Sequence, residues 1–101
     1  RRDLPRVICD NEASPSSTLV EVHAYDEPGL AHKIASALAL VGTDIVCARI
    51  ATEKADALDV FYVTDRAGLK LSEEAGREVE TVLKERLSRP GAAEAGTVPG
   101  G

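Results

Sequence analysis

The residue types that carry out catalysis are present in this sequence, but their spacing does not group them. Cys9 and Cys47 are far apart, and neither has the spacing to a second cysteine or a histidine that metal sites use. His23 and His32 have no serine or cysteine partner indicated by spacing, so both are interpreted as surface or boundary side chains. No glycine-rich phosphate-binding motif occurs. The sequence therefore predicts no catalytic residues, no metal site and no cofactor.

One segment has the features of a ligand site, namely residues 26–30, which read Asp-Glu-Pro-Gly-Leu. A strand is predicted to run into a helix there, and the free N–H groups and positive end of the helix can receive a carboxylate. Gly29 lets a ligand or a neighbouring backbone approach closely, and Asp26 is placed to hold an ammonium or amide group. The alternative is a plain helix start with Pro28 at the first helical position. The residues themselves leave both interpretations open.

Hydrophobic periodicity predicts the elements that would position this segment. Period-two patterns predict four strands, and a period of 3.6 predicts two helices. The strands are Arg6–Asp10, Thr18–Tyr25, Asp44–Thr52 and Leu58–Thr64. The first helix is expected to begin with Pro28 in its first turn and to end before Gly42. Ser72 caps the second helix, whose buried face is predicted to be Ala75, Val79, Val82, Leu83 and Leu87.

The order strand, strand, helix, strand, strand, helix predicts an α+β fold. Two helices on one face of a four-stranded antiparallel sheet is the economical packing, with the 6–10 strand at the edge beside 18–25. Residues 6–89 form the domain, 1–5 an approach segment, and 90–101, rich in Pro, Gly and Ala, a disordered tail. The strand 58–64 is apolar on both faces, so alternation does not decide which set faces the helices.

Composition excludes several classes of partner. The 101 residues suffice for one domain. A net charge of −5 without a basic cluster excludes nucleic acid as a partner, and the longest apolar run is far too short to span a bilayer. Two single cysteines, expected as reduced thiols in or near the core, fit a cytoplasmic location. Since Met is absent even from position 1, we expect a fragment of a larger protein.

Several segments together carry a resemblance to known proteins. The element strand-Asp-x-Pro-Gly-Leu-helix resembles the signature of ACT domains, small sandwiches that bind amino acids and form dimers. Further segments are similar to the family of bifunctional uridylyltransferase/uridylyl-removing enzymes, and the similarity covers about Pro5 to Leu87. These segments are Asp10–Ser14, Asp44–Ile45, Ala48–Thr52 and Asp59–Asp65.

The resemblance implies a ferredoxin-like ACT sandwich that senses glutamine in an enzyme that uridylylates the PII nitrogen-signalling protein. The catalytic nucleotidyltransferase domains would lie upstream, and the domain would form a homodimer. Residues that match the family's ligand site are Asp26, Pro28, Gly29, Leu30 and Ile45. The alternative is an ACT module used only for dimerisation or docking, without a ligand. A domain of an amino-acid biosynthetic enzyme is disfavoured by the segments just named.

Overall fold

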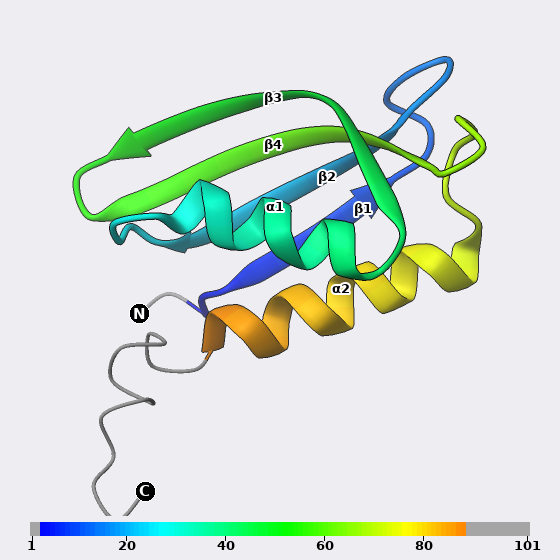
Figure 1. Ribbon diagram of the computed structural model, residues 1–101. Coiled ribbons are helices and arrows are strands. Elements are labelled where there is room, and N and C mark those ends of the chain that lie inside the picture. Colours follow the sequence, from blue (N-terminus) through cyan, green and yellow to red (C-terminus); the bar gives the residue numbers. More distant parts are fainter. Residues whose placement is uncertain (1–2, 89–101) are drawn as a thin grey trace, which may run out of the picture.

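The computed structural model describes residues 3–88 of the chain, which form four strands and two helices (Figure 1). Their order is that predicted from the sequence. The strands are β1 (Arg6–Asp10), β2 (Thr18–Tyr25), β3 (Thr43–Glu53) and β4 (Asp56–Asp65). The helices are α1 (Leu30–Leu40) and α2 (Glu73–Ser88).

The strands form one antiparallel sheet in the order β1-β2-β4-β3. Both helices lie on the same face of this sheet, and the other face carries no helix (Figure 1). The α+β class, the four-stranded antiparallel sheet and the two helices are thus confirmed. β1 and β3 are the outer strands, and β3, the longer of the two, lies on the side away from β1.

The hydrophobic core lies between the sheet and the helices. In β4 the structure decides what alternation left open, because Phe61 and Val63 are buried on the helix side whereas Val60 and Tyr62 are half-buried on the open face. On α2, Val79 and Leu83 are buried and the other predicted residues pack against the core. The largest fully covered hydrophobic side chains on β2 and α1 are Val20, Val22, Ile34 and Leu38.

The two helices begin in different ways. Ser72 caps α2 as predicted, since its hydroxyl accepts a hydrogen bond of 3.0 Å from the Ala75 N–H. The expectation that Pro28 occupies the first position of α1 is wrong. Gly29 is the N-cap, with a left-handed φ of 77°, and the helix begins only at Leu30. A residue with left-handed backbone angles cannot be part of a right-handed α-helix. Pro28, which precedes Gly29, therefore lies in the turn before the helix.

Strands β3 and β4 are longer than the patterns predicted. A tight turn with Lys54 at φ 60° joins them, so the polar residues on either side continue the ladder from Glu53 and Asp56. A register shift between Ile45 and Cys47 leaves Val46 without a partner on β4. Ile45, rather than Val46, therefore shares the helix-side face with Ala48 and Ile50.

The two cysteines differ in environment. Cys9 is half-buried against the core, and burial, with a smaller effect of Glu80, raises the pKa of its thiol to about 12. This thiol is therefore protonated and unreactive near neutral pH. The expectation that both cysteines lie in or near the core is wrong for Cys47, which is exposed because β3 is an outer strand.

Ile34 offers a direct test of the core. Its side chain is fully covered, so Ile34→Ala is expected to lower the free energy of unfolding by about 2–5 kcal/mol. On the same helix Leu40 is 70% exposed, and Leu40→Ala is expected to change it by less than about 0.5 kcal/mol. Urea denaturation measures both. Similar losses in the two variants would contradict the described packing of α1.

The predicted tail, residues 90–101, lies outside the described residues. Within residues 3–88, neither helix is long and apolar enough to cross a membrane.

Candidate ligand site at the start of the first helix

The turn from β2 into α1 is held at both ends. The Asp26 N–H donates a hydrogen bond of 2.8 Å to the Ala55 carbonyl, which ties the turn to the β3–β4 hairpin. Leu30, at the other end, is buried in the core. Between them Pro28 and Gly29 are exposed. The turn is therefore fixed in position while its tip stays open to solvent.

Gly29 decides the shape of this tip. Its φ of 77° is a conformation that residues with a side chain rarely adopt, which is a local reason for glycine. A Cβ added at Gly29 would meet no atom within 4 Å. The space above Gly29 is thus free of protein, and a ligand can contact the backbone there.

The start of α1 lacks the groups that complete the start of α2. Within the described chain, no side chain caps α1 and no acidic residue lies in its first turn. By contrast α2 has Ser72 as its cap and Glu73 and Glu74 in its first turn. The Leu30 N–H donates to the Glu27 carbonyl at 3.2 Å. The other N–H groups of the first turn and the positive dipole end of α1 have no side-chain cap, which is the arrangement that binds a carboxylate or another anion.

Glu27 places a negative charge beside this positive end. Its carboxylate pairs with the Lys33 ammonium at 3.2 Å, and both side chains are partly buried. Lys33 also donates its backbone N–H to the Gly29 carbonyl at 2.9 Å. The ion pair offsets the charge of Glu27, so this residue does not cancel the attraction of the helix start for an anion.

The structure reveals a buried acid that the sequence pattern does not single out. Asp59 on β4 is 1% exposed, and neither of its carboxylate oxygens has a hydrogen-bond partner among residues 3–88. Burial raises the pKa of the Asp59 carboxyl above its ordinary value of 3.8. An interaction with the Ala51 backbone N–H, which falls outside hydrogen-bond geometry, partly opposes this, and the Asp26 carboxylate adds to it. Asp26 thus couples Asp59 electrostatically to the turn.

A signal for Asp59 exists in the sequence. It has the same parity along β4 as Phe61 and Val63, so it must face the helices once those two residues do. Alternation alone did not show which set faced inward. The burial of Asp59 therefore became visible only with the packing of the helices.

The raised pKa of Asp59 predicts how stability depends on pH. The folded chain keeps a proton that the unfolded chain releases above pH 3.8, so the stability contributed by this group is full below that pH and is lost as pH rises through the raised pKa. Asp59→Asn does not titrate there. Its free energy of unfolding relative to wild type is expected to increase between about pH 4 and about pH 7. A pH-independent difference in urea denaturation would contradict the assignment.

The structure brings four of the five predicted site residues together. Asp26, Pro28, Gly29 and Leu30 form the turn, but Ile45 lies near the opposite end of the sheet, where it pairs with Val63. The turn adjoins the far end of β3, at Glu53. Eight residues separate Ile45 from that end, roughly 26 Å along a strand. Ile45 therefore does not contact the turn within one chain.

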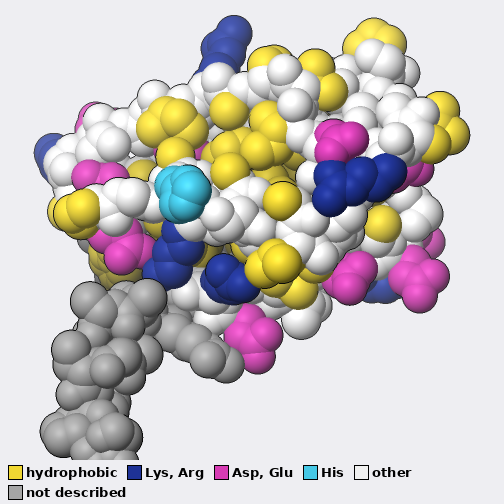
Figure 2. All heavy atoms as spheres, viewed as in Figure 1, with side chains coloured by type: hydrophobic (Ala, Val, Ile, Leu, Met, Phe, Trp, Pro, Cys, Tyr) yellow, Lys and Arg dark blue, Asp and Glu magenta, His cyan; other side chains and the backbone are white. Residues whose placement is uncertain are grey.

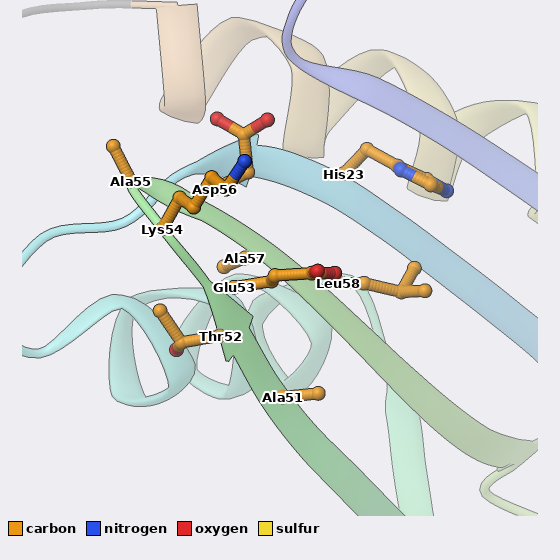
Figure 3. Close-up of a pocket in the computed structure, with 9 residues that line it drawn as sticks. All are labelled: His23, Ala51, Thr52, Glu53, Lys54, Ala55, Asp56, Ala57 and Leu58. Atoms are coloured by element: carbon orange, nitrogen blue, oxygen red, sulfur yellow. The ribbon is translucent and has the colours of Figure 1, made fainter.

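An open hollow of about 770 Å³ lies beside the β3–β4 hairpin and includes none of the predicted site residues. His23, Ala51 and Leu58 point to the same side of the sheet there (Figure 3). This is the helix-free face, because the register pairs His23 with Leu58, between the buried positions of both strands. None of the residues that line the hollow form a recognisable catalytic grouping.

Known proteins share much of this sequence. The chain is 42% identical over 88 residues, 85% of its length, to the bifunctional uridylyltransferase/uridylyl-removing enzyme of Gluconobacter oxydans. It is 44% identical over 70 residues, 69% of its length, to the enzyme of that name from Azospirillum brasilense. The chain is homologous to a segment of these enzymes. The enzyme from Streptomyces coelicolor is also similar, at 37% identity over 83 residues, 82% of this chain.

The shared segment is a small part of each relative. It covers 9% of the Gluconobacter enzyme, 8% of the Azospirillum enzyme and 10% of the Streptomyces enzyme. No family model and no solved structure matches the chain. The resemblance to the bifunctional enzymes is thus confirmed at the level of one segment.

Proposed function

We propose that this chain is an ACT-type regulatory domain that binds an amino acid, with glutamine as the ligand, in a uridylyltransferase/uridylyl-removing enzyme. The observation that carries the proposal is the uncapped start of α1 at Gly29, in a chain similar to these enzymes. The sheet order with both helices on one face supports the ferredoxin-like ACT architecture, with β1 as its edge strand.

The proposed ligand lies over the turn. Its α-carboxylate accepts hydrogen bonds from the free N–H groups at the start of α1, and the backbone of Pro28 and Gly29 forms the floor. Asp26 is exposed at the rim of this turn, where its side chain can contact a polar group of the ligand. Leu30 anchors the helix start from below, since its side chain is buried.

A second copy of the chain completes the proposed site. The outer edge of β3 has no partner strand among the described residues, and it is long and exposed. Hydrophobic side chains gather between β3 and α1 on the helix side (Figure 2). The exposed apolar residues of this region are Leu40 at 70%, Ile50 at 54% and Ile45 at 39%, and Val46, at the register shift of β3, is 60% exposed. Such an edge favours pairing with another strand.

Antiparallel pairing of two β3 strands gives Ile45 a place in the ligand site. A twofold axis between Ala48 and Arg49 sets Ile45 of the second copy opposite Thr52. That position adjoins the hairpin to which Asp26 is hydrogen-bonded. The homodimer thereby brings all five predicted residues to one site, which the single chain does not.

The proposed role is to shift a population of domain arrangements. Ligand at the turn favours one arrangement, and the two opposing activities of the parent enzyme, uridylylation and removal of the uridylyl group from PII, respond in opposite directions. The catalytic nucleotidyltransferase domains lie upstream of this segment in the proposed parent, which is cytoplasmic. In this proposal the 101 residues themselves contribute no catalysis.

The alternative function is dimerisation or docking without a ligand, which the exposed apolar edge of β3 favours. Thermal unfolding separates the two. A ligand bound only to the folded state stabilises it by about 2.7 kcal/mol at one hundred times its Kd. Glutamine is therefore expected to raise the Tm by several degrees, and glutamate by less. Unchanged Tm values across an amino-acid panel, from a chain that still dimerises, would favour the alternative.

A further inference from the structure

Asp59 is costly to the fold. Its carboxylate is 1% exposed and lacks a hydrogen-bond partner within the described residues. An ionised group buried in this way loses its hydration, and the interaction with the Ala51 backbone N–H offsets this loss only in part. An apolar side chain of similar size would fit among the neighbouring core residues at lower cost. The position therefore suggests a use for the charge that the ligand-free chain does not show.

Of the four sheet neighbours of Asp59, three are buried and one is exposed. Its neighbours along the strand face, Ala57 and Phe61, are buried, and so is Val22, its partner on β2. Its partner on β3, Ile50, is 54% exposed. Ile50 is thus the one exposed residue of these four neighbours, so β3 is the side of the sheet from which a ligand group can approach Asp59.

The charges near the site have opposite signs at its two ends. The start of α1 is positive and uncapped. Asp59 is acidic, and Asp26 of the turn lies close enough to influence it electrostatically. Glu27 does not compete for a cationic group, because Lys33 already pairs with it. A zwitterion satisfies both ends at once, with its carboxylate at the helix and its ammonium at the acids.

We propose that Asp59 is a specificity-determining residue that binds the α-ammonium group of the amino acid, while the start of α1 binds its carboxylate. This inference rests on the proposed function, and it adds the group that separates amino acids from simple carboxylic acids. An ammonium carries the charge that a buried carboxylate requires, and it donates three hydrogen bonds. The neutral side-chain amide of glutamine supplies no charge that would compensate the Asp59 carboxylate.

Two ligands and one isosteric variant test the proposal. Wild type and Asp59→Asn are titrated calorimetrically with glutamine and with 4-carbamoylbutanoate, which is glutamine without its α-ammonium group. Wild type is expected to bind glutamine on the order of 10- to 100-fold more tightly than 4-carbamoylbutanoate, the range of a charge-assisted hydrogen bond. In Asp59→Asn the two ligands are expected to bind with nearly equal affinity. Only glutamine loses affinity, because only glutamine has the α-ammonium group that pairs with Asp59.

Glu21→Gln is the matched control, since it removes one negative charge on the helix-free face of β2. It is expected to keep the wild-type preference. If wild type binds glutamine and Asp59→Asn keeps the full preference, the Asp59 inference is wrong and the proposed function stands. If wild type binds no amino acid, the Asp59 inference and the proposed function are both wrong. Should Asp59→Asn not fold, equal binding of the two ligands by wild type would by itself overturn the inference.

Discussion

Gly29→Val is expected to abolish glutamine binding while the chain still folds. The glycine lies at φ 77° with open space where a side chain would point, so the valine side chain occupies the position proposed for the ligand. The loss of hydrogen bonds to the ligand carboxylate, about 1.5–3 kcal/mol each for a charged group, reduces affinity by roughly 100-fold or more. Calorimetric titration with glutamine measures the change.

A second glycine, Gly68, provides a control that distinguishes the effect of backbone strain from the effect of blocking the ligand. Gly68 has a φ of 84°, also with nothing within 4 Å of an added Cβ, and it lies in the turn after β4. Gly68→Val therefore carries a similar strain, about 1–2 kcal/mol or more, away from the site. It is expected to keep wild-type affinity. Equal loss of binding in both variants, or in neither, would remove the turn at Gly29 from the ligand site.

Val46→Lys is expected to convert the proposed dimer to monomers. Val46 is 60% exposed on β3, at the unpaired position of the register shift, and a lysine on an edge strand opposes pairing with another strand. Each copy contributes one lysine. If each loses water without a partner at about 1 kcal/mol or more, the Kd of the dimer rises at least roughly 30-fold. Sedimentation equilibrium measures it.

Leu69→Lys is the control for this variant. Leu69 is 64% exposed in the turn after β4 and does not belong to the edge of β3, so the same change of charge there is expected to leave the dimer intact. Val46→Lys is also expected to weaken glutamine binding, because Ile45 of the second copy no longer reaches the site. A dimer that persists in Val46→Lys would place the interface elsewhere on the molecule.

The order of elements was predictable because each one carries a local signal. The strand 18–25 alternates without interruption, and Ser72 and Gly42 mark helix ends by their own chemistry; the structure places all three as predicted. The errors lie where backbone geometry overrides local pattern. The left-handed conformation of Gly29 delays the helix start, and that of Lys54 shortens the hairpin turn. Neither conformation follows from hydrophobic periodicity.

The candidate site was predictable only in part. The residues 26–30 are contiguous, so a motif sufficed to place four of them together. Ile45 and Asp59 are distant in sequence, and their relation to the turn depends on packing. The burial of Asp59 can be predicted only when it is known which face of β4 meets the helices. Ile45 joins the proposed site only when a second copy of the chain pairs along β3. Contacts of this kind leave no local signal in a single sequence.

The central claim is that the start of α1 binds an amino acid, and calorimetric titration of the 101-residue chain with glutamine tests it most directly. Glutamate and 4-carbamoylbutanoate serve as comparison ligands, and Gly29→Val as the site variant. The account predicts saturable binding of glutamine at one ligand per chain, weaker binding of both comparison ligands, and loss of binding in Gly29→Val. Absence of heat from a folded wild-type chain at millimolar glutamine, or unchanged binding in Gly29→Val, would contradict it.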